Sequence, residues 1–220
     1  MDVIAVLNQK GGAGKTTIAT HLARAYQLNG LSTILIDSDP QGSARDWAAA
    51  SEGNPVMTVG IDRPTLDRDV RRLTADMVVI DGAPQASDLA VSATKAASFV
   101  LIPVQPSPYD IWAASDLVEV VKQRIELTEG KLRAAFVISR AIPGTTLSRD
   151  IAEALAGYEL PVLTTRIHQR QDYPKTAAHG LTVLDQRRNA AAAEEIRALA
   201  VEVLATLRAE NTTTPEESNR

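Results

Sequence analysis

Short runs of apolar residues alternate with longer segments of helical periodicity along the chain. The apolar runs predict strands over residues 2–7, 32–37, 57–60, 76–81, 98–104, 132–139 and 161–167. Helical periodicity predicts helices over residues 15–28, 43–50, 65–73, 87–97, 109–127, 148–156, 172–180 and 188–208. Strands that are apolar on both faces and alternate with helices are typical of parallel sheets covered by helices. The pattern therefore predicts an α/β fold with a mostly parallel, doubly wound sheet and helices on both faces.

Length and composition favour one domain in a reducing compartment. The 220 residues carry a formal net charge of -4 and include no cysteine, which excludes disulfides, iron–sulfur clusters and thiolate zinc sites. We expect a single domain over residues 1–208, a disordered polar tail over residues 209–220 and a cytoplasmic location. No apolar run approaches the roughly 20 residues of a membrane span. The apolar stripe of the last predicted helix is expected to face the core, because the tail that follows it is acidic and polar.

Glycines and lysines follow the first predicted strand in the segment NQKGGAGKTT, residues 8–17. Glycine lets successive backbone N–H groups surround phosphate oxygens, and a helix that begins near Lys15 adds its positive N-terminus. In such a phosphate-binding loop (P-loop), Lys15 is expected to reach the β- and γ-phosphates, and the Thr16 hydroxyl to ligate Mg²⁺. Thr17 is expected to donate to the α-phosphate. The segment therefore predicts a nucleoside-triphosphate site.

The loop departs from the ordinary G-x-x-x-x-G-K-[ST] pattern, because Gln9 stands at the position of the first glycine. The pattern K-G-G-x-G-K-[ST] resembles the deviant Walker A loop of the ParA/MinD family of ATPases, and the chain is most similar to small ParA proteins of the ParF type. In that family the early lysine crosses a dimer interface and contacts the ATP of the partner. The resemblance implies this role for Lys10, and with it a homodimer in the ATP state. A second cation there offsets charge on the phosphoryl oxygens.

Three aspartates end predicted apolar strands. Asp37 and Asp39 lie in ILIDSDPQGS, and Asp81 lies in VVIDGAP. A carboxylate at the end of an apolar strand is costly unless it meets a cation. By resemblance to the family, Asp81 is the Walker B residue that holds Mg²⁺ through water, Asp39 positions or activates the attacking water, and Asp37 supports the metal and Lys15. The alternative is that they cap helices at strand–helix turns.

These interpretations define the candidate site. The catalytic residues are expected to be Lys10, Lys15 and Asp39. The nucleotide is expected to contact Lys10, Gly11, Gly12, Ala13, Gly14, Lys15, Thr16, Thr17, Asp37 and Asp81, and the metal Thr16, Asp39 and Asp81. The resemblance implies ATP rather than GTP. The base is expected near residues 139–143 and the loop after Thr165.

A proline-rich segment, IPVQPSPYDIWAAS, follows the fifth predicted strand. Pro103, Pro106 and Pro108 restrict the backbone and end the strand. Similar segments occur in small ParA proteins and in the positioning ATPases of carboxysomes. The segment is therefore either a dimer or assembly surface, or a stiff loop.

Residues 160–190 carry a local excess of positive charge in a chain of negative net charge. The basic residues are Arg166, Arg170, Lys175, Arg187 and Arg188, against the acids Asp172 and Asp185. Such a patch can grip phosphates without reading sequence, or it can be an ordinary solvated face. The resemblance implies nonspecific binding to nucleoid DNA when the ATP dimer forms, and we expect these five residues to take part.

The resemblance implies a ParA-like ATPase that partitions plasmid or chromosome DNA. Its ATP dimer would bind nucleoid DNA, and a ParB-like or cargo-adaptor partner would stimulate hydrolysis and release it. Two alternatives stay open: the positioning of a protein cargo such as a microcompartment, and a metabolic P-loop enzyme such as a dethiobiotin-synthetase-like ligase. The D-x-D-P-Q-G segment, residues 37–42, favours the ParA interpretation over the ligase.

Overall fold

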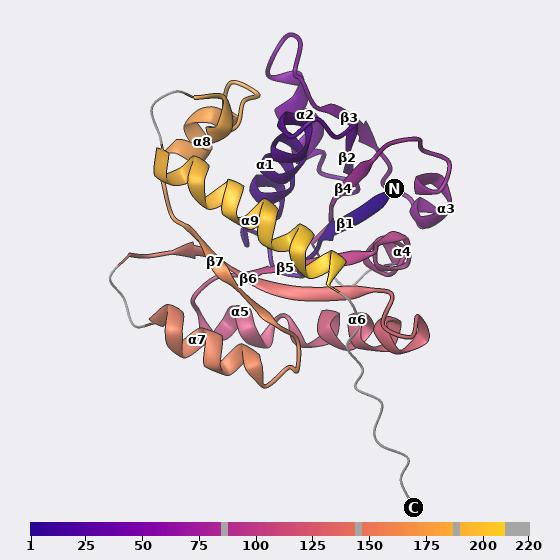
Figure 1. Ribbon diagram of the computed structural model, residues 1–220, viewed down its shortest axis with the longest axis vertical. Helices are drawn as coiled ribbons and strands as arrows, with labels where there is room; N and C mark the ends of the chain where they lie inside the picture. Colours follow the sequence, from indigo (N-terminus) through magenta and orange to yellow (C-terminus); the bar gives the residue numbers. More distant parts are fainter. Residues whose placement is uncertain (85–87, 144–146, 187–189, 210–220) are drawn as a thin grey trace, which may run out of the picture.

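The computed structural model describes residues 1–84, 88–143, 147–186 and 190–209. Within these residues, seven strands form one sheet in the order β3-β2-β4-β1-β5-β6-β7 (Figure 1). Every pair of neighbouring strands is parallel. The predicted α/β fold is therefore confirmed, and the part of the sheet that is described is fully rather than mostly parallel.

The strands lie within two residues of the predicted positions. They are β1 (Asp2–Val6), β2 (Thr33–Asp37), β3 (Met57–Gly60), β4 (Met77–Asp81), β5 (Phe99–Val104), β6 (Arg133–Ala141) and β7 (Val162–His168). The central strands β1, β2, β4 and β5 are almost entirely buried. Strands of this kind carry apolar residues on both faces, which is why continuous apolar runs located them.

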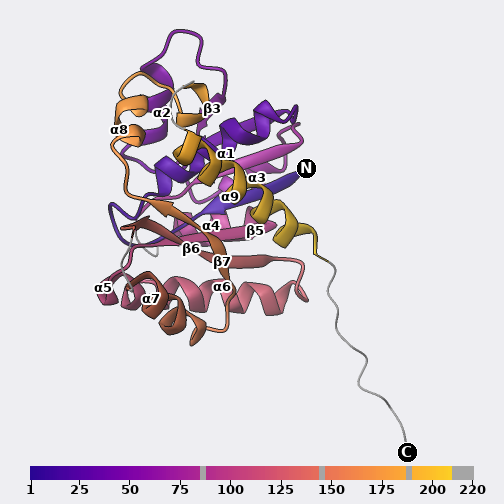
Figure 2. The same ribbon diagram turned by 60° about the vertical axis from the view of Figure 1, so that its left-hand side comes forward.

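Two helical layers cover the sheet, as Figure 2 shows from the side. One layer contains α1 (Lys15–Leu28), α2 (Ser43–Ala49), α8 (Asp172–Ala177), the 3₁₀ helix η1 (Val183–Asp185) and α9 (Ala190–Arg208). The other contains α3 (Leu66–Val70), α4 (Asp88–Ala96), α5 (Pro108–Trp112), α6 (Ser115–Leu127) and α7 (Leu147–Ala156). Neighbouring residues of β1 alternate between them: Ile4 and Val6 face the α1–α9 layer, whereas Val3 and Ala5 face the opposite one.

The long helix predicted over residues 109–127 is two helices, and this prediction was wrong in detail. Helix α5 ends at Trp112 and α6 begins at Ser115. The Ser115 hydroxyl donates to the carbonyl of Trp112 at 2.9 Å, which satisfies that carbonyl from a side chain. The apolar spacing continues through the break, since Ile111, Ala114 and Leu117 are all buried, so periodicity alone does not reveal it.

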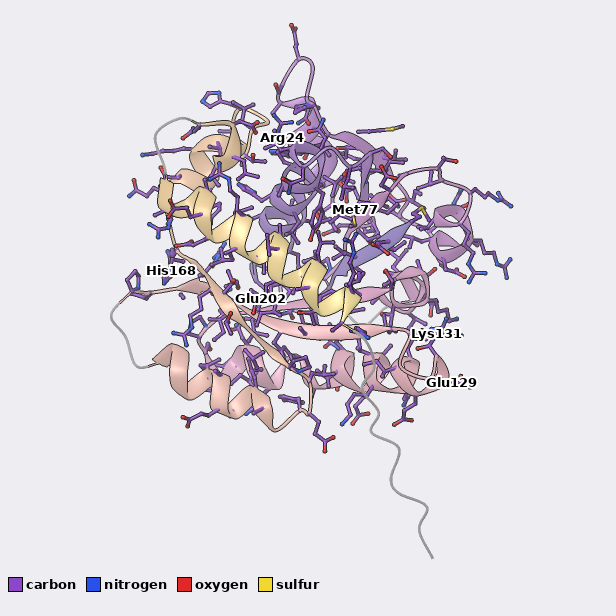
Figure 3. The ribbon with its side chains drawn as sticks, viewed as in Figure 1. Arg24, Met77, Glu129, Lys131, His168 and Glu202 are labelled. Carbon is purple, nitrogen blue, oxygen red and sulfur yellow. The ribbon has the colours of Figure 1, made fainter. Side chains whose placement is uncertain are left out.

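Helix α9 covers the edge strand β7 with its apolar stripe turned inward. Ile196, Leu199 and Val203 are buried in the core beside α1, as predicted. Glu202 extends from α9 to the strand, where its carboxylate accepts hydrogen bonds from the backbone N–H groups of Thr164 and Thr165 (Figure 3). Edge-strand amides are thereby occupied, which opposes edge-to-edge association. No helix in the described ranges combines the length and the apolar character needed to cross a membrane.

The register of the sheet gathers the predicted site at one edge. Asp37 and Asp81 end β2 and β4 directly beside each other, and Val6, the last residue of β1, pairs with Asp81. The glycine loop leaves β1, and Gln105 follows β5 on its other side. The carboxyl edge of a parallel sheet is where ligands bind in such folds.

Candidate nucleotide-binding site

The glycine loop has a backbone that only glycine adopts readily. Gly12 and Gly14 have φ angles of 80° and 92°, in the left-handed region. Gly14 is the N-cap of α1, and its carbonyl accepts the first helical hydrogen bond, from the N–H of Ile18 at 2.9 Å. The N-terminus of a 14-residue helix therefore opens onto the loop, which suits an anion.

Asn8 fixes the start of the loop from inside. Its side chain is buried, and Nδ2 donates to the carbonyl of Pro103 at the end of β5. Its Oδ1 accepts from the backbone N–H of Lys10 at 2.9 Å. The loop is thus tied to the neighbouring strand before the glycines begin.

Two further side chains, from residues distant in the sequence, form hydrogen bonds to the loop. The Ser139 hydroxyl donates to the carbonyl of Ala13 at 2.7 Å, and the Gln105 amide donates to the carbonyl of Gly12 at 2.9 Å. Both bonds turn carbonyls away from the cradle, so N–H groups can face the ligand. Sequence reasoning missed both residues as supports, because their partners lie 126 and 93 positions away.

Lys15 is buried at the first turn of α1, and its Nζ donates to the carbonyl of Lys10 at 3.2 Å. Burial lowers the pKa of Lys15 below its usual value, and Asp81 and Asp39 oppose that shift by favouring the charged form. A bound phosphate would supply a stronger counter-charge at the same place. The geometry matches the expected role of Lys15.

Thr16 and Asp81 meet at the mouth of the loop. The Thr16 hydroxyl donates to Oδ2 of Asp81 at 2.7 Å, whereas Oδ1 of Asp81 is buried with no hydrogen-bond partner among the described residues. Burial raises the pKa of Asp81 to about 7, the Thr16 bond opposes this, and neighbouring Asp37 adds to it. A buried carboxylate oxygen without a partner is costly, and a cation or a water bound to one would satisfy it.

This donor set fits Mg²⁺. Mg²⁺ prefers oxygen ligands, and in phosphate-binding sites it keeps waters and uses only one or two protein groups besides the phosphates. Thr16 and Asp81 supply such oxygens. No group of three or more His, Asp or Glu side chains in the described ranges is arranged to hold a metal ion by itself. The site therefore suits a metal that arrives with a nucleotide.

Asp37 and Asp39 have different surroundings, although two positions separate them. Asp37 is fully buried, and its carboxylate accepts from the backbone N–H groups of Asp39 at 3.1 Å and Arg45 at 2.8 Å. Asp39 is partly exposed, and its Oδ1 accepts from the N–H of Gln41 at 2.9 Å. Asp37 is thus a structural anchor of this loop, whereas Asp39 lies where solvent and a substrate can reach it.

Lys10, the second lysine of the loop, contacts its own chain. Its Nζ lies 2.5 Å from Oδ2 of Asp110, in the short helix α5. Asp110 is buried, its other carboxylate oxygen, Oδ1, has no hydrogen-bond partner among the described residues, and the Lys10 side chain is 40% exposed. The Lys10 side chain is therefore partly exposed, and its ion-pair partner is a buried carboxylate. Asp110 was missed from the sequence; an isolated acid in an apolar segment was the available signal.

A cavity of about 400 Å³ opens beside the loop, on the side of β6 and β7. Its lining comes from the loop and α1, from the ends of β6 and β7, from the two residues after β7 and from α8: Gly14, Thr17, Ile18, Ser139, Arg140, Ile167, His168, Gln169, Arg170, Tyr173, Pro174 and Ala177. Arg140 has a φ of 51°, so the backbone turns sharply where β6 enters this wall. The lining includes the two segments predicted to surround the base.

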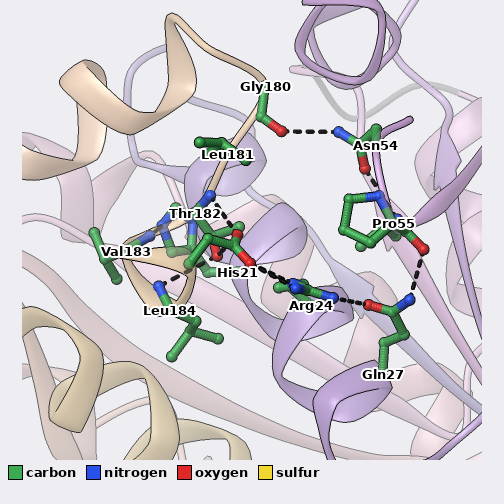
Figure 4. Close-up of polar contacts among 12 residues, drawn as sticks. His21, Arg24, Gln27, Asn54, Pro55, Gly180, Leu181, Thr182, Val183 and Leu184 are labelled. Atoms are coloured by element: carbon green, nitrogen blue, oxygen red, sulfur yellow. Dashed lines mark hydrogen bonds and ion pairs between the residues drawn. The ribbon is translucent and has the colours of Figure 1, made fainter. Parts of the chain in front are cut away.

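Buried His21 joins the loop's helix to this wall. Burial lowers its pKa to about 4, so the ring is neutral near pH 7. Its Nδ1 lies 2.6 Å from the carbonyl of Thr17 and must donate, and its Nε2 accepts from the N–H of Val183 at 3.1 Å (Figure 4). The ring also contacts Tyr173 edge-on, with centroids 5.2 Å apart. Arg24 adds an ion pair to Asp185 at 2.6 Å.

The five basic residues predicted to bind DNA differ in their surroundings. Arg166 and Lys175 are exposed, on β7 and in the last turn of α8. Arg170 donates to Glu195 at 2.5 Å and lines the cavity, where His168 also pairs with Glu195. Arg187 and Arg188 lie outside the described residues. Arg166 and Lys175 are therefore open to solvent, whereas the guanidinium of Arg170 pairs with Glu195.

The comparisons with known proteins agree with this fold and loop. A model of the CobQ/CobB/MinD/ParA nucleotide binding domain matches residues 4–183, and the chain belongs to this family. The maintenance of carboxysome distribution protein A of Halothiobacillus neapolitanus is 32% identical over 209 residues, 91% of this chain and 95% of that protein. The chromosome-partitioning ATPase Soj of Thermus thermophilus is 28% identical over 236 residues, 92% and 95% of the two chains.

A solved structure shows the same fold at lower identity. Cobyrinic acid a,c-diamide synthase from Mycobacterium smegmatis, with a bound ATP analog and magnesium, superposes with a TM-score of 0.77. The match covers 95% of this chain and 96% of that one, at 23% identity. The sequence relatives thus include a carboxysome distribution protein and a chromosome-partitioning ATPase, so the family by itself does not decide the cargo.

Proposed function

We propose that the chain is a ParA-like ATPase that binds ATP with Mg²⁺ and works as a nucleotide-dependent dimer. The observation that carries the proposal is the joint geometry at the loop: buried Lys15, and the Thr16 hydroxyl on an Asp81 carboxylate whose other oxygen is buried without a partner among the described residues. The nucleotide would lie along residues 10–17, with Asp37 anchoring the loop beside it. Thr16, Asp81 and the more exposed Asp39 would hold the metal, directly or through water.

The hydrolysis chemistry needs little covalent participation from the protein. Lys15 would offset the charge that develops on the γ-phosphoryl oxygens, and Asp39 would orient the attacking water in line with the bond that breaks. Mg²⁺, when held by Thr16 and Asp81, would offset the negative charge of the phosphates. The water supplies the oxygen that phosphate gains, and ADP leaves. Asp39 suits this role because its carboxylate is partly exposed while its backbone is hydrogen-bonded.

The proposed dimer rests on Lys10, which would contact the ATP bound to a second copy of the chain. In the isolated chain Lys10 pairs with Asp110, so reaching the phosphates of a second copy requires that pair to separate. The ATP of the partner would supply the counter-charge in its place. Turnover by one chain alone would be slow, because the site would lack its second cation.

Lys10→Ala is expected to keep nucleotide binding and to lose the ATP-dependent dimer. The measurement is light scattering with ATP and Mg²⁺, on a background of Asp39→Ala to prevent turnover. The Lys10-intact protein should approach twice the 23.6 kDa chain mass, and the Lys10→Ala protein should stay near it. Lys131→Ala, an exposed lysine after α6, is the matched control. A dimer of unchanged strength in Lys10→Ala would remove Lys10 from the interface.

The cavity beside the loop is proposed to take the base. Its lining by Ser139, Arg140 and residues 167–170 supports this, because a nucleotide whose phosphates lie on the loop would extend its ribose and base toward that wall. Thr17 and Gly14 belong to both the loop and the cavity, so the two are continuous.

For the cargo, we propose DNA partition with nonspecific binding of nucleoid DNA by the ATP dimer. The exposed Arg166 and Lys175 support contact with phosphates, and Arg170, Arg187 and Arg188 stay in the proposed set. A partner protein would stimulate hydrolysis and release the dimer. The second candidate is the positioning of a protein cargo, which the similarity to the carboxysome distribution protein favours. Both use the same ATP-dependent dimer.

A further inference from the structure

Arg45 connects three points around the loop that carries Asp39. Its backbone N–H donates to Oδ2 of Asp37 at 2.8 Å, and its Nε lies 3.5 Å from the same oxygen. Its Nη2 donates to the carbonyl of Asp39 at 3.2 Å and to Oδ2 of Asp62 at 3.3 Å. One side chain thus joins the end of β2, the loop after it and the segment after β3.

Two glycines leave room for this side chain. A Cβ on Gly60 would lie 2.9 Å from both Cδ and Nη1 of Arg45, which is closer than real contacts allow. Gly60 has no positive φ, so its backbone does not require glycine, and the space occupied by Arg45 accounts for it. A Cβ on Gly42 would lie 3.2 Å from Nη2. Gly42 has a φ of 74°, so its backbone favours glycine by itself, whereas a Cβ at Gly60 would have to displace the flexible end of Arg45.

Arg45 restrains the backbone of Asp39 through its carbonyl. The N–H of Asp39 donates to buried Asp37, and its carbonyl accepts from the N–H of Gly42 at 2.9 Å and from Arg45. Arg45 also lies against Asp37, so it offsets a negative charge next to Asp39 and Asp81. The planar guanidinium suits contact with several acceptors at once, which an ammonium group cannot match.

We propose that Arg45 is a positioning residue for ATP hydrolysis, holding the Asp39 loop in the geometry that orients the attacking water. This inference rests on the proposed ATPase function. Arg45 would act through Asp39, because its guanidinium contacts the backbone carbonyl of Asp39 rather than the carboxylate of that residue. Because a small misplacement of a reacting group can cost about 100-fold in rate, its removal should affect turnover more than binding.

The kinetic test compares Arg45→Ala, Arg45→Lys and Gly60→Ala with the wild type. Arg45→Ala should lower kcat at least about tenfold and change the KM for ATP less than about threefold. Arg45→Lys should recover only part of the loss. Gly60→Ala should displace the arginine and lower kcat in the same direction. The double variant should be no slower than Arg45→Ala alone, because both changes remove one contact.

A second measurement keeps the inference separate from the ATPase proposal. Hydrogen exchange of the peptide covering residues 38–46 should be at least about fivefold faster in Arg45→Ala and in Gly60→Ala than in wild type. Arg63→Ala is the matched control, because Arg63 pairs with Asp69 at 2.8 Å on the exposed start of α3. It should leave both exchange and kcat unchanged.

The outcomes separate the two proposals. Absence of ATP hydrolysis in wild type would sink the proposed function, and hydrogen exchange would then decide whether Arg45 holds the loop. Unchanged exchange of residues 38–46 in Arg45→Ala overturns the inference. So does a higher KM at constant kcat, which would make Arg45 a nucleotide contact instead.

Discussion

Lys15→Ala is expected to abolish measurable ATP binding, with at least about a 100-fold loss of affinity. Lys15 is buried at the first turn of α1, its Nζ donates to the carbonyl of Lys10, and the charges of Asp81 and Asp39 favour its protonated form. Hydrogen bonds to charged groups contribute about 1.5–3 kcal/mol each, and in the proposed site Lys15 would make them to two phosphates. Isothermal titration with a non-hydrolysed ATP analog measures the loss directly.

The control for Lys15→Ala removes the same charge elsewhere. Lys95 lies exposed in the last turn of α4, on the opposite helical layer, and Lys95→Ala should bind ATP as the wild type does. Circular dichroism should show that both variants keep the helical content. ATP affinity equal to wild type in a folded Lys15→Ala protein would refute the assignment of the phosphate loop.

Asp39→Ala is expected to bind ATP and dimerise, but to lower kcat by about 100-fold or more, so that the dimer accumulates. The reason is that the Asp39 carboxylate is partly exposed, whereas the Asp37 carboxylate is fully buried and accepts two backbone hydrogen bonds. Phosphate release under single-turnover conditions separates this chemical step from product release.

Asp46→Ala is the matched control for Asp39→Ala. Asp46 is an exposed acid on the neighbouring helix α2, so the control removes the same charge seven positions away without touching the loop. It should turn over ATP at the wild-type rate. A normal kcat in Asp39→Ala would exclude Asp39 from the mechanism and leave the attacking water to another group.

The positions of strands and helices were predictable where the pattern of buried apolar residues by itself determines them. The strand predicted over residues 32–37 is observed at Thr33–Asp37, and the helix predicted over 15–28 is observed at Lys15–Leu28. The break between α5 and α6 was not predictable, because the buried positions Ile111, Ala114 and Leu117 keep a helical spacing through it. The predicted domain end and tail stay predictions, since residues 210–220 lie outside the described part.

The candidate site was predictable for those residues that follow or end a strand at a short, fixed spacing in the sequence. The glycines, Lys15 and Thr16 follow one strand directly, and Asp81 ends another that the parallel register places beside it. The supports were not predictable, because Asp110 meets Lys10 across 100 positions and Ser139 meets Ala13 across 126. No spacing rule connects such pairs; only the folded sheet does. The assigned roles of all these residues remain proposals that the variants above test.

Nucleotide-dependent binding to DNA is tested most directly by a mobility shift of an unrelated DNA duplex at one fixed salt concentration, with ATP, with ADP and without nucleotide. A shift is expected with ATP alone, because only the ATP dimer would present two copies of the exposed Arg166 and Lys175. Equal shifts in all three conditions, or none in any while ATP is hydrolysed, would contradict a nucleotide-dependent switch on DNA.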